Sequence, residues 1–206
     1  SDIYYASPDL DYVPNFALGR LPARTPQEAD AMITKIEDYR KSLSADWFHS
    51  IDLCGGDPFN GGFEGELACQ SVIDQGLVDN FKINKYYKTS KLFNTDTMKK
   101  AFSEDVGFIY VDSHGSGDAI IAEPGEINTD DVMALPKRSK LPILVSVACL
   151  NGMFDADLVN YKVEKYPNSK GLSFGQACMA SPGGPIAYFG GSRLNYAGVN
   201  WGVESG

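Results

Sequence analysis

The sequence has few positive charges, few histidines and no long hydrophobic run. Lys and Arg total 18 against 27 Asp and Glu, which gives a formal net charge of −9. Nucleic acids and anionic lipids attract proteins through basic patches, so this deficit argues against both as partners. No apolar run approaches the roughly 20 residues of a membrane-spanning helix, so we expect no membrane insertion.

The sequence also lacks an initiating methionine, because it opens at Ser1. We interpret it as a processed piece of a longer polypeptide, so a missing signal peptide carries no information about the compartment. Its 206 residues, 43% hydrophobic and 22% charged, suit one globular domain with a substantial core. We find no internal repeat or domain boundary and treat 1–206 as one domain.

Cysteines are few and lie far apart in the sequence. Their spacing lacks the short paired intervals of a zinc site, and we assign no metal ligands. Their density is also too low for a disulfide scaffold. Without further context, each is expected to be a buried free thiol. The four are Cys54, Cys69, Cys149 and Cys178.

Helices and strands are predicted to alternate along the chain. Thr25-Pro26-Gln27-Glu28 supplies an N-cap, a proline at the first helical position and an acidic first turn, so a helix begins at Pro26. Strands that are apolar throughout are typical of a parallel sheet covered on both faces. We therefore predict an α/β fold, a three-layer α/β/α sandwich with a mostly parallel sheet. The predicted helices are about 26–43, 64–76, 95–102, 128–136 and 172–179, and the predicted strands are 47–54, 81–87, 107–112, 143–148 and 186–190.

Two of the predicted strands end in reactive side chains. One is followed by Ser113-His114-Gly115, and a later one is followed by Cys149 and then Asn151-Gly152. Reactive groups gather past the carboxyl ends of strands in an open parallel sheet. If the two strands are neighbours, His114 and Cys149 emerge at the same edge. That arrangement places a thiol nucleophile beside a general base.

The only two histidines lie in different settings. His49 lies in a predicted strand beside Phe48, where a packed or half-exposed side chain is expected. His114 lies in a Ser-His-Gly-Ser-Gly turn, which favours a functional role. Gly115 lets a substrate carbonyl approach the backbone N–H, as an oxyanion hole requires.

Three long segments resemble parts of one known enzyme family. LPILVSVACLNGMF resembles its catalytic-cysteine segment, VPNFALGRLPARTPQEADAMITKIEDY resembles the entry to its catalytic subdomain, and SFGQACMASPGGPIAYFGGS resembles the segment downstream of the nucleophile. The family is that of the gingipains, cysteine peptidases of the caspase-like clan, whose pattern is His-Gly after one apolar strand and Ala-Cys after a later one. The resemblance runs from about Tyr4 to Asn200 and implies a caspase-like fold.

The resemblance implies a peptidase mechanism. Cys149 would be the nucleophile, His114 the acid/base, and the N–H groups of Gly115 and Cys149 the oxyanion hole. It also implies protein or peptide substrates, a secreted or cell-surface location and no required cofactor. Gingipains bind structural calcium, but no EF-hand spacing identifies ligands here.

The resemblance also points to residues around the dyad. Gingipains have an acidic residue near the histidine, and Asp57 is the nearest match. Members specific for Arg or Lys place a carboxylate in the pocket for the residue before the cleaved bond. Alignment puts Glu66 there, with Glu64 as the alternative, although acidic residues also suit the first turn of any helix. Tyr196 is a candidate aromatic wall of the pocket.

Several functions stay open at this point. The preferred one is an endopeptidase that cleaves after Arg or Lys. Sortase-like members of the family transfer the acyl group to an amine, and an inactive caspase-fold binding scaffold is a third alternative. A serine hydrolase built on Ser113 or Ser116 is weaker, because adjacency in sequence does not aim a hydroxyl at the His114 ring. Family segments before Ser1 and after Trp201 are missing, so remaining parts of the same polypeptide are expected partners.

Overall fold

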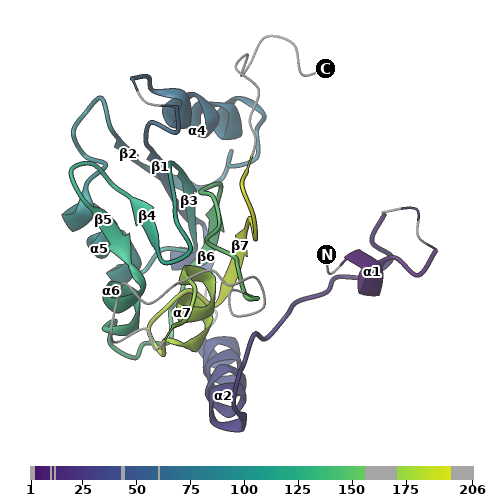
Figure 1. Ribbon diagram of the computed structural model, residues 1–206. Coiled ribbons are helices and arrows are strands. Elements are labelled where there is room, and N and C mark those ends of the chain that lie inside the picture. Colours follow the sequence, from purple (N-terminus) through teal and green to yellow (C-terminus); the bar gives the residue numbers. More distant parts are fainter. Residues whose placement is uncertain are drawn as a thin grey trace.

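A five-stranded parallel sheet forms the centre of the protein (Figure 1). The computed structural model describes residues 3–9, 11, 13–42, 45–59, 61–155 and 171–195. The strand order is β2-β1-β3-β6-β7, and a separate antiparallel pair joins β4 to β5. The strands are β1 Ser50–Gly55, β2 Lys82–Tyr87, β3 Phe108–Asp112, β4 Ala119–Ile121, β5 Glu126–Asn128, β6 Ile143–Ser146 and β7 Ala187–Gly190.

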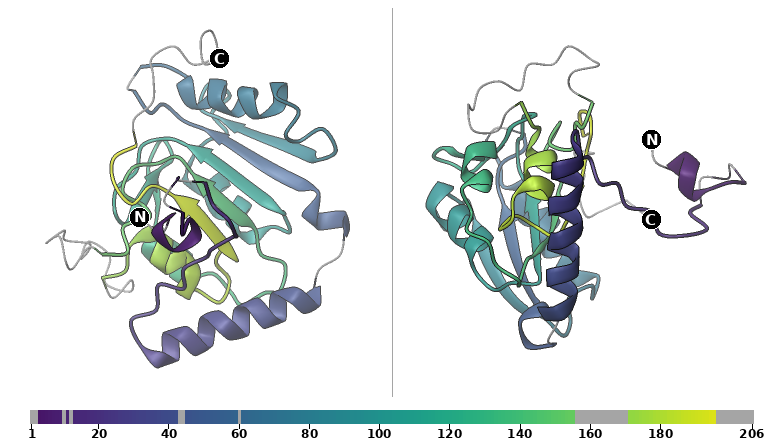
Figure 2. Two further views of the ribbon diagram at one scale, coloured as in Figure 1. Left: turned by 90° about the vertical axis from the view of Figure 1, so that its right-hand side faces the viewer. Right: turned by 90° about the horizontal axis from the view of Figure 1, so that it is seen from below.

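Helices cover both faces of this sheet. α4 packs on β1 and β3 from one side, whereas α5, α6 and α7 share a buried cluster with the other face. α2 packs against α7, at the opposite end of the molecule from α4 (Figure 2). The predicted three-layer α/β fold is confirmed. The helices are α1 Ile3–Ala6, α2 Pro26–Ser42, α3 Ala45–Phe48, α4 Glu64–Asp74, α5 Thr95–Ser103, α6 Thr129–Met133 and α7 Phe174–Ala180.

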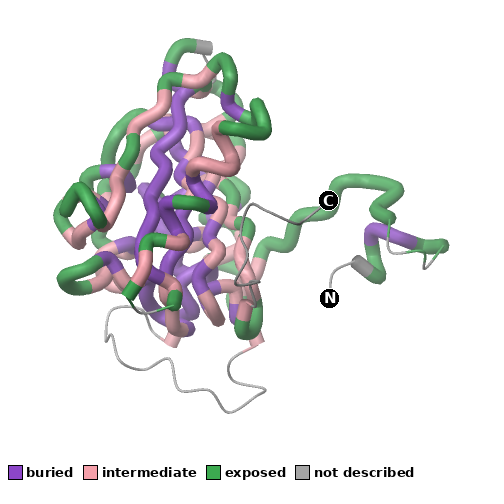
Figure 3. The backbone as a smooth tube through the Cα atoms, turned by 90° about the horizontal axis from the view of Figure 1, so that it is seen from above, coloured by how far each residue is buried: buried purple, intermediate pink, exposed green. Residues whose placement is uncertain are grey.

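The core follows from the alternation of side chains along the strands. Leu53 faces α4, and its neighbour Cys54 faces α5, because successive strand residues point to opposite faces of a sheet. The inner strands β1, β3 and β6 carry many of the buried residues, whereas the segment 13–24 is largely exposed (Figure 3). Cys54, Cys69 and Cys178 are buried free thiols, as expected, and Cys149 is only half-buried.

Three helices begin with a capping box. Asn94, Asn128 and Ser173 each form a capping box at the start of α5, α6 and α7. The end of α7 is capped from outside, because the buried Lys35 Nζ of α2 donates to the carbonyls of Cys178 at 2.8 Å and Ser181 at 2.9 Å. Carbonyls at a helix end lack an intrahelical partner and favour a cation, so this contact fixes α2 on α7.

The predicted strand 47–54 is wrong at its start. Ala45–Phe48 is the short helix α3, and β1 begins only at Ser50. Trp47 is buried and packs edge-on against Tyr39 of α2, a contact between two helices that overrides the local β-propensity. His49 therefore lies outside the strand; it is exposed, and its ring packs edge-on against Phe81.

None of the helices in the described ranges is long and apolar enough to cross a bilayer.

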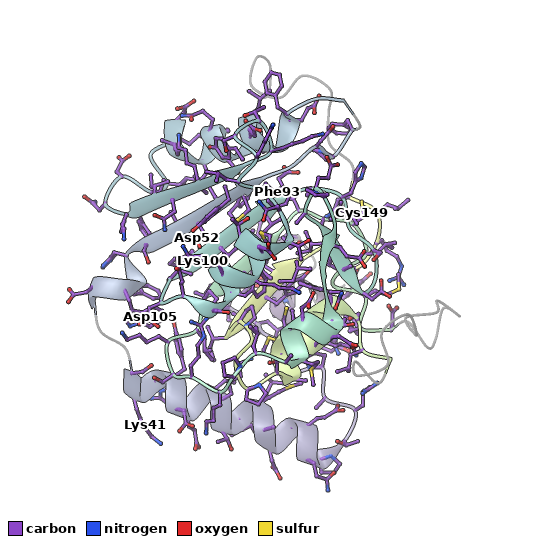
Figure 4. The ribbon with its side chains drawn as sticks, turned by 90° about the vertical axis from the view of Figure 1, so that its left-hand side faces the viewer. Lys41, Asp52, Phe93, Lys100, Asp105 and Cys149 are labelled. Atoms are coloured by element: carbon purple, nitrogen blue, oxygen red, sulfur yellow. The ribbon has the colours of Figure 1, made fainter. Side chains whose placement is uncertain are left out.

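A buried carboxylate lies in the middle of β1. Asp52 is fully buried; its Oδ1 accepts a hydrogen bond from Asn84 at 2.8 Å, and its Oδ2 has no partner in the described part of the chain. It faces α5, which carries Lys100 (Figure 4). Burial, with a smaller contribution from the charge of Glu104, raises the pKa of Asp52 to about 6.

This pKa predicts a pH-dependent effect of Asp52→Asn on stability. Because the folded-state pKa lies above the ordinary value of 3.8, the folded protein retains a proton that the unfolded chain releases, and stability falls as pH rises from about 4 to 6. Asp52→Asn keeps the acceptor for Asn84 and removes the charge. We expect it to raise the free energy of unfolding by up to about 3 kcal/mol above pH 6, and by little below pH 4.

Denaturant unfolding of both proteins across this pH range measures the difference. Burial also raises the pKa of Asp112 to about 6, but Asp112 is present in both proteins and cancels in the comparison. If Asp52→Asn raised the free energy of unfolding by the same amount at every pH, the charge of Asp52 would not be the cause.

Candidate active site

The ends of β3 and β6 meet at one edge of the sheet. The two strands are parallel neighbours, with Phe108 opposite Ile143 and Val111 opposite Ser146. The loops that follow are in contact, because a Cβ placed on Gly115 would lie 2.7 Å from the Cβ of Ala148 and 2.9 Å from the carbonyl oxygen of Cys149. The structure therefore brings His114 and Cys149 to the same edge.

Cys149 lies in a tight turn after β6. Leu150 has a φ of 64°, an uncommon conformation for a residue other than glycine. The turn is held by hydrogen bonds to the segment after β7: Leu150 N–H donates to the Arg193 carbonyl at 3.0 Å, and Gly152 N–H to the Gly191 carbonyl at 2.9 Å. Strain of this kind gathers at functional sites.

The thiol itself contacts Asn195. The backbone N–H of Asn195 donates to the Cys149 Sγ at 3.3 Å. The Asn195 side chain donates to the carbonyl of Val147 at 2.6 Å and to that of Ala148 at 3.2 Å. Asn195 thus fixes the backbone that carries the nucleophile. Sequence reasoning missed it, although β7 lies beside β6 and the residues after β7 share this edge.

The His114 side chain is half-buried beside this turn. Its carbonyl accepts from Ile121 N–H at 2.9 Å, which ties the loop to β4. Its Nε2 is buried and has no hydrogen-bond partner among the described residues. Within the described residues, no hydrogen bond joins the His114 ring to the Cys149 thiol. The Nε2 atom of His114 therefore remains available to move a proton.

The predicted oxyanion-hole donors also remain available. Over the described ranges, neither the N–H of Gly115 nor that of Cys149 has an acceptor in the protein. Both belong to the two loops in contact. Two such N–H groups near a thiol can hold the negative oxygen of a tetrahedral intermediate.

Asp57 makes contacts elsewhere. Its buried carboxylate accepts from Lys88 Nζ at 2.6 Å and from the N–H groups of Gly61 and Gly62. Although burial opposes it, these bonds hold the pKa of Asp57 well below its usual range. None of the contacts described for Asp57 is to His114, so its predicted role beside the histidine gains no support from them.

The two pocket candidates lie at the start of α4. Glu66 is buried; one of its oxygens accepts from Thr89 N–H at 2.7 Å and the other from Thr89 Oγ1 at 2.8 Å. Glu64 Oε2 is buried without a partner in the described residues. Glu66 therefore anchors the loop after β2, whereas Glu64 has unused hydrogen-bonding capacity. The third candidate, Tyr196, lies outside the described residues.

The hydroxyl groups of the two serines that flank His114 donate hydrogen bonds to other residues. Ser113 Oγ donates to the Ile121 carbonyl at 2.8 Å, and Ser116 Oγ to Asp118 Oδ1 at 2.7 Å. Neither hydroxyl points to the His114 ring, which disfavours a serine nucleophile. No cluster of three or more His, Cys, Asp or Glu able to hold a metal is found within the described ranges.

Comparisons with known proteins agree with this geometry. The sequence matches peptidase family C25 over residues 1–205. An uncharacterised protein of Archaeoglobus fulgidus is 24% identical, with 92% of this chain and 49% of that protein aligned. Lys-gingipain HG66 of Porphyromonas gingivalis is also 24% identical, over 98% of this chain and 11% of its own length.

Structural similarity extends over most of the chain. The crystal structure of the Arg-specific cysteine proteinase gingipain R superposes with a TM-score of 0.62 at 20% identity, covering 91% of this chain and 43% of that one. At this identity the likeness establishes the fold. The chain thus spans about half the length of the archaeal relative and a smaller part of the gingipain.

Proposed function

This chain belongs to peptidase family C25, a family of cysteine peptidases, and on that premise we propose that it hydrolyses peptide bonds through Cys149 and His114. The observation that carries the proposal is the contact between the His114–Gly115 loop and the Cys149 loop. A thiol, an imidazole nitrogen and two backbone N–H groups lie at one edge of the sheet, and the nitrogen and both N–H groups have no partner in the described part of the chain. These are the groups that acyl transfer to a thiol requires.

The chemical steps follow from these groups. The Cys149 thiolate attacks the substrate carbonyl, an S–C bond forms, and the N–H groups of Gly115 and Cys149 hold the negative oxygen. His114 donates a proton to the nitrogen of the leaving amine as the C–N bond breaks. Water then gives a proton to His114 and attacks the thioester; the C–S bond breaks, the acid is released, and the Cys149 thiolate and the protonated His114 are restored.

We propose a basic residue, Arg or Lys, before the cleaved bond. Glu66 and Glu64 lie on the first turn of α4, at the same carboxyl edge of the sheet as the dyad. The Glu66 carboxylate has lone pairs left after its two bonds to Thr89, and Glu64 keeps a buried oxygen without a described partner. A carboxylate with such free hydrogen-bonding capacity favours a cationic side chain.

A panel of Arg, Lys, Asn and Asp peptide reporters tests this preference. We expect Arg or Lys reporters to be cleaved with a kcat/KM at least about 10-fold above the others, because a buried carboxylate pairs with the cation. Glu66→Gln should remove most of this advantage, and Glu64→Gln is the matched comparison on the same turn. A preference for Asn or Asp would reject the basic pocket and leave the cysteine chemistry standing.

We propose the substrates, location and partners of the enzyme from its resemblance to the family alone. Its substrates would be proteins or peptides, met after secretion or at the cell surface. Its partners would include remaining parts of the same polypeptide, since the chain spans about half of the archaeal relative. The steps above use no cofactor, and any structural calcium would lie away from them.

A further inference from the structure

We infer that Asn151 is a positioning residue that joins the histidine loop to the cysteine loop and so sets the geometry of the dyad. The inference rests on the proposed function, because the residue acts through His114, Gly115 and Cys149. Asn151 itself lies two residues beyond the nucleophile and does not touch the thiol in the contacts described for it.

Every polar group of the Asn151 side chain is used. The residue is fully buried. Its Oδ1 accepts from Ser146 Oγ of β6 at 3.1 Å. Its Nδ2 donates to the Ser116 carbonyl at 2.5 Å and to the Ala119 carbonyl at 2.9 Å. The amide therefore connects the end of β6 to both ends of the turn that follows His114.

The Asn151 backbone adds a third element. Its carbonyl accepts from the N–H of Gly175, in the first turn of α7, at 2.8 Å. One residue thus meets β6, α7 and the turn before β4. Buried amides with complete hydrogen bonding specify a single arrangement, because each lost bond leaves a buried polar group unpaired.

This connection reaches the reacting groups directly. Gly115 packs against Asn151, since a Cβ placed there would lie 3.0 Å from Nδ2. Gly115 follows His114, and Ser116, whose carbonyl Asn151 holds, follows Gly115. On the other side, Asn151 follows Leu150, whose left-handed φ of 64° turns Cys149 toward this edge. Moving Asn151 would shift both loops relative to each other.

The chemistry of the site requires an amide at this position. Nδ2 is the donor for the Ser116 carbonyl and a second donor for the Ala119 carbonyl, which also accepts from Ser116 N–H at 2.9 Å. Oδ1 is the acceptor for the Ser146 hydroxyl. Only Asn or Gln offers both from one side chain, and Gln is longer by a methylene. Aspartate has the right shape but would set a carboxylate against two carbonyl oxygens.

The test compares Asn151→Ala with Asn84→Ala. Asn84 is another asparagine whose side-chain amide donates a hydrogen bond, in its case to the Asp52 carboxylate of the neighbouring strand. It lies in the middle of β2, away from the catalytic edge. In Asn151→Ala we expect kcat to fall roughly 10- to 100-fold while KM changes by less than about 3-fold, since displaced groups affect the chemical step. Asn84→Ala should keep both constants.

A second measurement does not depend on peptidase activity. Cys54, Cys69 and Cys178 are buried, so iodoacetamide modifies the native protein at Cys149. We expect the rate of this alkylation to fall at least about 3-fold in Asn151→Ala, because the donors around Sγ lose their alignment. If the wild-type protein cleaves no peptide, the proposed function fails, and an unchanged alkylation rate would then overturn the positioning role as well.

Asn151→Asp supplies a pH readout that a loss of packing would not. Its kcat relative to wild type should rise as pH falls, because the protonated carboxyl can again donate to a carbonyl. If Asn151→Ala does not fold, Ser146→Ala removes only the hydroxyl that orients Oδ1, and its kcat should fall by a smaller factor. The inference would be refuted if the folded Asn151 and Ser146 variants had the same kcat and the same alkylation rate as the wild-type protein.

Discussion

Replacing Cys149 with alanine is expected to lower kcat/KM for peptide reporters by at least about 10⁴-fold. The substitution removes the sulfur that forms the covalent bond, and the two serines that flank His114, Ser113 and Ser116, donate their hydroxyl protons elsewhere. Cys149 is half-buried, and its Sγ contacts only the backbone of Asn195 among the described residues. The fold should therefore survive, and initial rates on Arg and Lys reporters measure the loss.

Cys178→Ala is the matched control. Cys178 is fully buried in α7, and burial raises the pKa of its thiol to about 12, so it carries no reactive thiolate. We expect this variant to keep kcat/KM within about 3-fold of wild type when folded. Full activity in Cys149→Ala would show that the nucleophile lies elsewhere and would end the proposal of a cysteine mechanism.

The position of the dyad was predictable because it depends on local patterns. The runs 107–112 and 143–148 are apolar apart from Asp112 and Ser146, which is typical of buried parallel strands. Parallel strands deliver the residues after them to one edge, so His114 and Cys149 needed only β3 and β6 to be neighbours. The N-caps Asn94 and Asn128 likewise depend on residues close in sequence.

Contacts between distant residues were not predictable in this way. Trp47 is in the short helix α3 and packs against the Tyr39 ring of α2, a contact that the strand-like run 47–54 does not reveal. Asp57 is bound by Lys88, 31 residues away in sequence, and Glu66 by Thr89, 23 residues away. Each carboxylate also anchors a loop beside the active site, a role that its position in the sequence does not reveal.

The supporting asparagines were missed for the same reason. Asn195 reaches Cys149 across 46 residues, and Asn151 reaches Ser116 across 35. An asparagine after a strand suits many turns, so its sequence position does not reveal these bonds. The two residues of the dyad could thus be predicted from two strand patterns. Their geometry depends on the loops after β3, β6 and β7, which only the folded sheet brings together.

The absence of a side chain at Gly115 is a further condition for activity. Its φ is not in the left-handed region, so alanine can adopt the backbone there. The obstacle is space, because a Cβ would lie 2.7 Å from the Ala148 Cβ and 2.9 Å from the Cys149 carbonyl oxygen. Distances this short force the two loops apart, and both oxyanion donors move with them.

We therefore expect Gly115→Ala to lower kcat roughly 100- to 1000-fold, the range for losing an aligned oxyanion-hole donor. Gly19→Ala is the matched control, because nothing lies within 4 Å of a Cβ at that position, and it should retain kcat within about 3-fold. Steady-state kinetics of the two folded variants, with melting temperatures compared, measure the difference. If Gly115→Ala turns over peptides as fast as Gly19→Ala, the contact between the histidine and cysteine loops does not set the geometry of the reaction.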